Sequence, residues 1–316
     1  LSDLLDLVAL GTVADLVRLD YNNRILIHHG INKIRSGNCN FGIEALTNLS
    51  NKKLENIKTS DLSFSIAPKI NAAGRLDDMA IGIKCLISKS KDEARKYANK
   101  LIVFNEQRKL VEKKMKDKAL SVLTSYMPED NYTITMFDSE WHQGVIGIVA
   151  SRLKEKYYRP TIIFAKDENG LLKGSGRSIP SFHLRDALDL LSKKNIDLIE
   201  NYGGHAMAAG LTIKIENFKL FCSKFEEITK ETLSQEDLNL TVEFDRSITT
   251  NNLNQETVRN INSQVWGQGF PSPVFHGIFN VIKQNIVANK HNKCLLQNKD
   301  NNYDAIFFNF SEELAD

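Results

Sequence analysis

Apolar residues in the first third of the chain recur mainly at helical spacing. Residues 23–37 carry isoleucines at this spacing and end at Gly37, a residue type that often follows the last turn of a helix. Residues 41–88 alternate short helical patterns with SFSIAPKINAAGRLDD (63–78). We interpret this stretch as a loop, because Pro and Gly stand among polar residues.

Residues 88 to 126 contain neither Pro nor Gly, and their apolar positions predict one long, charged helix. Helices of this kind often connect two domains. The sequence MPED (127–130) is expected to end it.

Strand-like runs follow. YTITMFD (132–138) and PTIIFAKDENGLLKGSGRSI (160–179) predict strands, with GVIGIVASRLKEKY (144–157) as a helix between them, which makes a βαβ unit. Residues 182–194 and 217–233 predict two further amphipathic helices. After residue 235, strand-like runs that begin with LNLTVEFDRSI predict a small all-β barrel or sandwich. The fold class is therefore α/β with a β-rich C-terminal part.

Composition limits the function classes. The chain has 316 residues, of which 42% are hydrophobic and 25% charged, so it is long enough for two or three globular domains. Lysine and arginine number 41 against 39 acidic residues, a net charge of only +2. Binding to nucleic acid would therefore depend on local clusters of positive charge.

Four scattered cysteines without a C-x-x-C pair argue against a structural zinc site and a disulfide scaffold. No apolar run is long enough to span a bilayer. We expect a cytoplasmic protein with no role in the membrane.

Asp15 follows small and apolar residues in GTVADLVRL, where we expect the chain to leave a strand. A carboxylate in this position could bind a hard divalent cation. Taken alone, however, the stretch favours a helix N-cap or a surface aspartate.

Three further stretches combine glycine with a strongly polar residue. INAAGRLDD places Asn71 and Arg75 around small residues, which suits either a forked phosphate contact or a tight turn. WHQGVIGIVASRL places His142 before a predicted helix N-terminus, where free N–H groups attract anions; packing accounts for its glycines but not for the histidine. In KGSGRSI, Ser175 and Arg177 point the same way if the segment is extended, as a phosphate clamp or as a solvated edge strand.

NYGGHAMAAG (201–210) contains Gly203, Gly204 and His205 among small residues. It suits either close packing of two elements or a floor that binds an anion. The basic run RKLVEKKMKDK (108–118) is interpreted as a solvated helix face, because acidic residues interrupt it. Spacing alone leaves the reaction undetermined.

The order of these stretches resembles the motifs of the RecJ family, single-strand-specific 5′→3′ DNA exonucleases of the DHH phosphoesterase superfamily. The motifs are ALGTVADLVRLD, APKINAAGRLDD, WHQGVIGIVASRL, GSGRSI and GGHAMAAG. GQGFPSPVF then resembles the signature that introduces the OB fold of that family. The resemblance covers nearly the whole chain, and six weak motifs in one order are hard to obtain by chance.

The resemblance implies four parts. Residues 1–87 would be the C-terminal part of a DHH domain, and 88–126 its connecting helix. Residues 127–235 would form a DHHA1 substrate-binding domain, and 236–316 an incomplete OB fold.

By motif, Asp15 would be the last metal-ligand aspartate of the DHH domain and would share in binding two cations, Mn²⁺ or Mg²⁺. His205 would lie over the scissile region as a catalytic residue, and Gly203 and Gly204 would bind substrate by bringing backbone N–H groups near a phosphate. The positions that would hold the terminal phosphate of the strand are Arg75, Ser175 and Arg177, and Asn71, His142 and Arg152 are assigned to the same cleft.

The sequence also departs from the family. It starts at Leu1, and the Asp-rich first motif, the second aspartate and the Asp-His-His motif are absent from it. We therefore expect a fragment that is inactive alone. Arg18 stands where the family usually has proline, and Phe270 where asparagine is usual, a change expected to alter the mouth of the barrel.

The implied function is a metal-dependent exonuclease on single-stranded DNA in repair and recombination, with a helicase and single-strand-binding protein as candidate partners. One alternative is a DHH phosphodiesterase that acts on short oligonucleotides or cyclic dinucleotides. The long helix and the β-rich C-terminal third argue against it, since short substrates need no OB fold. The other alternative is a non-catalytic module that binds single-stranded nucleic acid.

Overall fold

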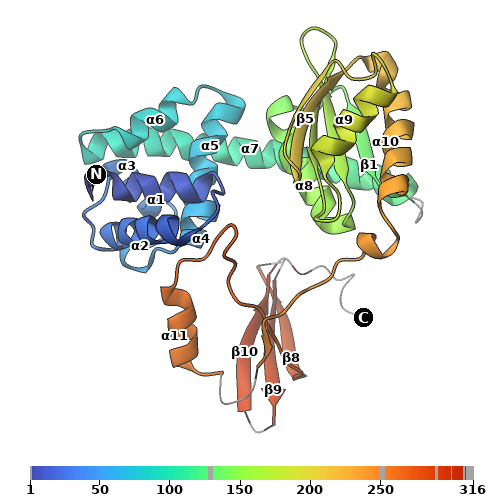
Figure 1. Cartoon of the computed structure of the whole chain (residues 1–316). Coiled ribbons are helices and arrows are strands. Elements are labelled where there is room, and N and C mark those ends of the chain that lie inside the picture. Colours follow the sequence, from blue (N-terminus) through green and yellow to red (C-terminus); the bar gives the residue numbers. More distant parts are fainter. Residues whose placement is uncertain are drawn as a thin grey trace. The chain divides into compact units, whose positions relative to one another are not determined.

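The structure, a computed structural model, describes residues 2–126, 131–248, 253–288, 291–299, 301–308 and 310. Contacts within the chain divide it into two compact units (Figure 1). The first unit comprises Leu1–Ile31, Lys58–Ser60 and Val242–Asp316, and the second Asn32–Ile57 and Asp61–Thr241.

The first unit begins with the short 3-10 turn η1 (Ser2–Leu4) and helix α1 (Leu5–Ala14), and the first part of α2 (Tyr21–Arg35) belongs to it too. Gly30 lets these helices approach closely, because a Cβ atom there would lie 2.2 Å from the carbonyl oxygen of Leu5. The sequence correctly predicted α2 with its end before Gly37.

The C-terminal part of the first unit contains an antiparallel sheet in the order β10-β9-β8 (β8 Asn280–Val287, β9 His291–Asn298, β10 Asn301–Phe307). A short parallel pair joins β6 (Arg246–Ser247) to β7 (Phe275–His276). The strand expected over 238–248 is present only as β6, and helix α11 (Gln255–Ser263) was not predicted. Its apolar residues Val258 and Ile261 are at helical spacing, but there are only two of them in a short polar stretch.

Phe270 stacks on Trp266, with 5.2 Å between the ring centroids, and the guanidinium carbon of Arg24 lies 3.7 Å from its ring centroid. An asparagine could make neither ring contact. Phe270 thus ties the segment after α11 to α2 within the first unit.

Short helical elements open the second unit and adjoin the end of α2. They are α3 (Phe41–Leu49), η2 (Leu54–Asn56), the π-helical turn η3 (Leu62–Ile66), α5 (Ala67–Leu76) and α6 (Ala80–Leu86). The single turn α4 (Thr59–Asp61) is divided, with Thr59 and Ser60 in the first unit and Asp61 in the second. The loop expected over 63–78 was wrong. Pro68 stands in the first turn of α5, where no backbone N–H is needed, and the buried side chains of Ile70, Ala72 and Ala73 give the helix an apolar face.

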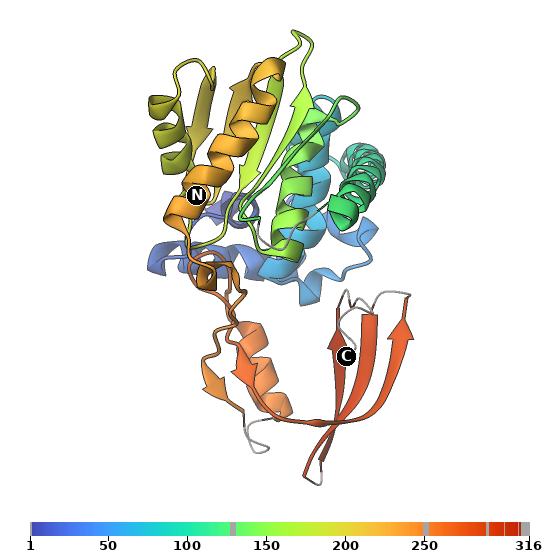
Figure 2. The ribbon, with the colours of Figure 1, turned by 90° about the vertical axis from the view of Figure 1, so that its right-hand side faces the viewer.

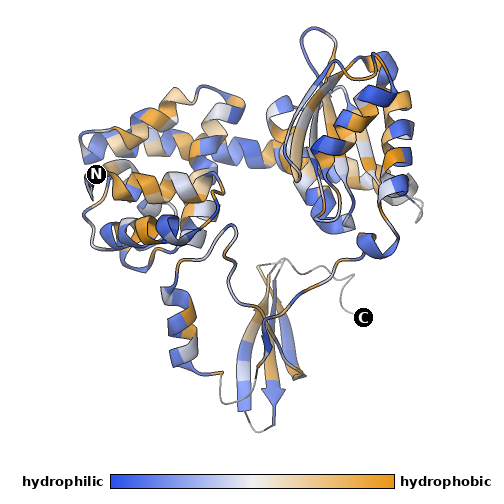
Figure 3. Cartoon of the chain, viewed as in Figure 1, coloured by the Kyte–Doolittle hydropathy of each residue, from blue (hydrophilic) through white to orange (hydrophobic). Residues whose placement is uncertain are grey.

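The long helix predicted from the sequence is α7 (Lys91–Tyr126). It packs on α3, α5 and α6 and also on α8 (Gln143–Tyr157). Between these two contact regions its surface is mainly hydrophilic (Figure 3). The segment 127–130, which was expected to end it, lies outside the described residues.

A five-stranded sheet in the order β1-β2-β3-β5-β4 forms the rest of the second unit (Figure 2). Its strands are β1 (Ile134–Asp138), β2 (Thr161–Lys166), β3 (Leu172–Arg177), β4 (Asn201–Gly204) and β5 (Ala208–Ile213). β1 and β2 are parallel and connected through α8, which confirms the predicted βαβ unit. The other neighbouring pairs are antiparallel.

The two faces of this sheet are covered differently. Helices α9 (Leu184–Lys194) and α10 (Phe218–Thr232) pack against one face through a core that includes Phe164, Leu211 and Phe221. On the other face, α8 and the end of α7 cover β1 and β2. Helix α8 also packs on β3, whereas Gly210 of β5 and Gly203 of β4 are exposed on this second face.

Candidate nucleic-acid interface

A basic cleft of about 520 Å³ lies between α5, α7 and α8 in the second unit. Five positively charged side chains line it, and none of the described residues in its lining is acidic. The basic residues are Lys69, Arg75, Arg108, Lys109 and Arg152; Ser50, Phe64, Ser65, Pro68, Asn71, Asn105 and Ile148 complete the wall.

The positive groups of the cleft crowd one another. Burial lowers the pKa of Lys69, and the charge of Lys109 lowers it further. Burial likewise lowers the pKa of Arg75, with Arg108 as the next cause. A bound anion would offset the repulsion among these cations, so their clustering suits a phosphate ligand.

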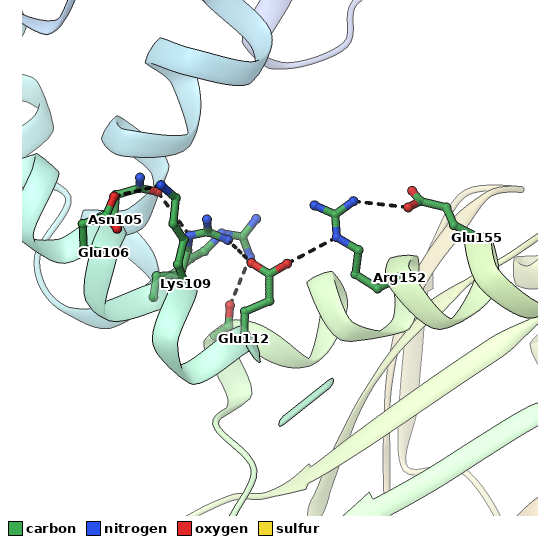
Figure 4. Close-up of polar contacts among 9 residues, drawn as sticks. Asn105, Glu106, Lys109, Glu112, Arg152 and Glu155 are labelled. Atoms are coloured by element: carbon green, nitrogen blue, oxygen red, sulfur yellow. Dashed lines mark hydrogen bonds and ion pairs between the residues drawn. The ribbon is translucent and has the colours of Figure 1, made fainter. Parts of the chain in front are cut away.

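Two glutamates offset part of this charge from beside the cleft (Figure 4). Glu112 accepts from Arg108 at 2.7 Å and pairs with Arg152 at 3.3 Å, and Glu106 pairs with Lys109 at 2.8 Å. These bonds hold the basic side chains in place on α7 and α8. They leave Lys69 and Arg75 as the less compensated charges.

Arg75 joins α5 to the start of α8. Its Nη1 donates to the carbonyl oxygen of Gly144 at 3.1 Å. A Cβ atom on Gly144 would lie 2.3 Å from the carbonyl oxygen of Arg75, so only glycine permits this approach. The turn-like interpretation of INAAGRLDD was wrong in its local structure, since Asn71 and Arg75 both lie on α5.

Ser175 and Arg177 lie on β3 and point to the same side, as the strand alternation predicted. Arg177 Nη1 donates to Ser175 Oγ at 3.2 Å and to the carbonyl oxygen of Gly176 at 2.7 Å. A Cβ atom on Gly147 of α8 would lie 2.8 Å from Ser175 Oγ and 2.9 Å from Arg177 Nη2. Burial lowers the pKa of Arg177, and Arg75 lowers it further, so the two arginines lie close enough to interact.

A floor of small residues continues the face that bears Ser175. The strand register places Ser175 opposite Gly210, and Gly210 opposite Gly203. Directly opposed residues of an antiparallel pair point to the same face. A Cβ atom on Gly203 would meet nothing within 4 Å, and one on Gly210 would meet only a backbone oxygen at 3.8 Å. Packing therefore does not explain these two glycines.

Gly204 differs from its neighbour. It has a φ of +139°, and a Cβ atom there would lie 2.4 Å from the carbonyl oxygen of Ala208. The exposed His205 follows in the turn between β4 and β5, and its N–H donates to the same oxygen at 2.8 Å. Ala208 and Gly210 belong to strand β5, and helix α9 packs against this strand, where Ala209 is buried.

His142 caps α8, since its Nδ1 accepts from the N–H of Gly144 at 3.1 Å. This bond accounts for the histidine that glycine packing left unexplained. The cap occupies an N–H group that the sequence had suggested for an anion.

Asp15 belongs to the other compact unit. It is exposed at the C-terminal end of α1, and its N–H donates to the carbonyl oxygen of Gly11 at 3.0 Å. Both the strand and the N-cap were wrong, because the continuous apolar run before Asp15 forms a largely buried helix. Among the described residues, no group of three or more His, Cys, Asp or Glu side chains could hold a metal ion.

Two domain families match the chain. The DHHA1 domain matches residues 120–231, and the RecJ OB domain matches residues 244–316. The single-stranded-DNA-specific exonuclease RecJ of Haemophilus influenzae is 44% identical over 99% of this chain, and that of Escherichia coli is 43% identical over 94%. The chain belongs to the RecJ family. It spans about half the length of these relatives, 56% and 52% respectively.

Solved RecJ structures agree with this membership. RecJ from Thermus thermophilus in complex with Mn²⁺ superposes with a TM-score of 0.80 at 28% identity, over 96% of this chain and 44% of that one. The Mg²⁺ complex of the same protein gives 0.79 over 93% of this chain. The mixed α/β fold class is confirmed.

The sequence missed part of the cleft in this RecJ chain. The run 108–118 was interpreted as a solvated helix face, yet Arg108 and Lys109 line the cleft. The sequence did not predict Lys69 or Phe64 as cleft residues either. The one available signal was Lys69 two positions before Asn71, inside a motif already chosen for its arginine.

Proposed function

We propose that this chain forms the part of a metal-dependent exonuclease that grips single-stranded DNA while 5′ nucleotides are removed, in DNA repair and recombination. One observation carries the proposal: a cleft lined by five basic residues lies beside Arg177 and the exposed glycine floor. Basic side chains hold a phosphate backbone, and a flat floor admits an extended strand. The related exonucleases, which are named for single-stranded DNA, support the substrate class.

Asp15 is the residue that we assign to metal binding. It is an exposed carboxylate at a helix C-terminus, where unpaired carbonyl groups add negative potential, so the site suits a hard cation. The solved relatives that contain Mg²⁺ and Mn²⁺ support these two metals. Bound cations would activate water and offset the charge that grows on the scissile phosphate.

Within this proposal we keep the four-part organisation at 1–87, 88–126, 127–235 and 236–316. The OB domain would guide the strand by backbone contacts and base stacking. Helicase and single-strand-binding protein would be partners, and the cytoplasm the location. No helix among the described residues is long and apolar enough to cross a membrane.

The 316-residue chain is expected to bind a 5′-phosphorylated single strand and to leave it intact. With one assigned metal ligand it lacks a complete metal site, whereas about three phosphate contacts would give a slope of log affinity against log salt of roughly −2. Fluorescence anisotropy over a salt series measures the binding, and gel analysis with Mn²⁺ measures cleavage. Affinity for dinucleotides equal to that for long strands would favour the small-substrate alternative, and efficient cleavage by this chain would refute the assignment of Asp15.

His205→Ala is expected to reduce turnover of single-stranded DNA about tenfold in the catalytically active protein, which is the size of one lost hydrogen bond to a charged group. Stability should change little, since the side chain is exposed in a turn. Turnover and melting temperature are measured on the same preparation. A large fall in melting temperature with unchanged specific activity would show that His205 serves packing and not catalysis.

A further inference from the structure

Phe64 is the one aromatic side chain among the described residues that line the basic cleft, and it is 82% exposed. It lies in the middle of η3, between Leu62 and Ile66, which are both fully buried. A residue two positions from each of these anchors lies roughly on the opposite side of a helical turn. The backbone therefore holds the phenyl ring toward solvent at the wall of the cleft.

Burial does not explain this phenylalanine. Phenylalanine is among the residue types most often buried, and the two neighbours of Phe64 in η3 already supply the apolar contacts of the turn. A single exposed apolar residue would need no explanation, but this one shares a cavity with five basic residues. An aromatic face next to clustered positive charge matches a nucleotide, which combines a flat base with an anionic phosphate.

Lys69 and Lys109 supply the charge beside the ring. Lys69 Nζ donates to Ser50 Oγ at 2.9 Å and to the carbonyl oxygen of Ser65. Ser65 directly follows Phe64 in the sequence, so these bonds fix the ammonium group near the backbone that carries the ring. Lys109 interacts electrostatically with Lys69 and pairs with Glu106. Two fixed cations within one cleft favour a phosphodiester between them.

We propose that Phe64 stacks on a nucleobase of the bound strand while Lys69 and Lys109 contact the phosphates next to that base. This nucleotide subsite rests on the proposed function. It adds a reason for single-strand selectivity, because a base within a duplex is paired and stacked on both sides and cannot lie on the ring. It assigns η3 a role in substrate recognition.

The test compares Phe64→Ala, Phe64→Leu and Phe64→Trp in the 316-residue chain, by anisotropy with an oligothymidylate of about 12 nucleotides. Phe64→Ala is expected to weaken binding about tenfold, within the range for a lost base–aromatic stack. Phe64→Leu should lose as much affinity as Phe64→Ala, whereas Phe64→Trp should keep the affinity of the unchanged chain. Ile196→Ala is the matched control, because Ile196 is similarly exposed, at 87%, and lies outside the cleft.

An abasic oligonucleotide of the same length separates stacking from a structural role. On this strand Phe64→Ala should bind as tightly as the unchanged protein. Equal losses on thymidylate and abasic strands, or full rescue by leucine, would overturn the subsite. If Phe64 variants bind normally while Arg75→Gln and Arg177→Gln weaken binding, the subsite fails and the proposed function stands; if the unchanged chain binds no single strand, both fail.

Discussion

Replacing Arg177 with glutamine is expected to weaken binding of a 5′-phosphorylated single strand by about 10- to 100-fold. Hydrogen bonds to charged groups contribute about 1.5–3 kcal/mol, and Arg177 is a half-buried guanidinium beside Ser175 and close to Arg75. Stability should hold or rise slightly, because burial and the charge of Arg75 both disfavour the charged form of Arg177. Anisotropy titration and urea denaturation measure the two effects.

Arg185→Gln is the matched control for this change. Arg185 is an exposed arginine on α9, which covers the opposite face of the sheet. A strand with a 5′-hydroxyl end provides the second control, and Arg177→Gln should affect it much less if the guanidinium holds the terminal phosphate. An equal loss of affinity for both strands would indicate that Arg177 contacts an internal phosphate. No loss for either strand would show that Arg177 does not contact DNA.

Gly204→Ala is expected to lower the free energy of unfolding by about 3 kcal/mol. A φ of +139° is strained for any residue with a Cβ atom, and the added methyl would overlap the carbonyl oxygen of Ala208. The turn that carries His205 would have to shift, so DNA binding should weaken as a consequence. Urea denaturation followed by circular dichroism measures the change.

Gly203→Ala is the natural control, because it makes the same substitution one position earlier on β4. A methyl there would meet nothing within 4 Å, so the unfolding free energy should be unchanged or slightly higher. Equal destabilisation by both substitutions would contradict the distinction between a glycine required by the backbone and a glycine left open to solvent.

Elements with a clear period could be predicted from the sequence. α7 and the βαβ unit have long, regular patterns, and both are confirmed. α1 and α5 were missed because an almost continuous apolar run hides the helical period in the first, and Pro68 with Gly74 resembles loop composition in the second. In the folded chain the proline stands in a first turn and the glycine within the helix.

Side chains on one element could also be paired from the sequence, as with Ser175 and Arg177 two positions apart on β3. Those on different elements could not. Lys69 meets Lys109 only because α5 packs on α7, and the charges of α7 give no sign of which of its faces contacts α5. The opposite roles of Gly203 and Gly204 likewise depend on the strand register and on one backbone angle.

We propose above that the open glycine floor beside the basic cleft is a surface for single-stranded DNA. The most direct test is the affinity of Gly203→Val for a 5′-phosphorylated oligothymidylate. Because valine favours strands and its Cβ atom would meet no neighbour within 4 Å, stability should hold or rise by up to about 1 kcal/mol. Its side chain would stand in the path of the bound strand and lower affinity at least about tenfold. Unchanged affinity in a stably folded Gly203→Val chain would contradict the claim.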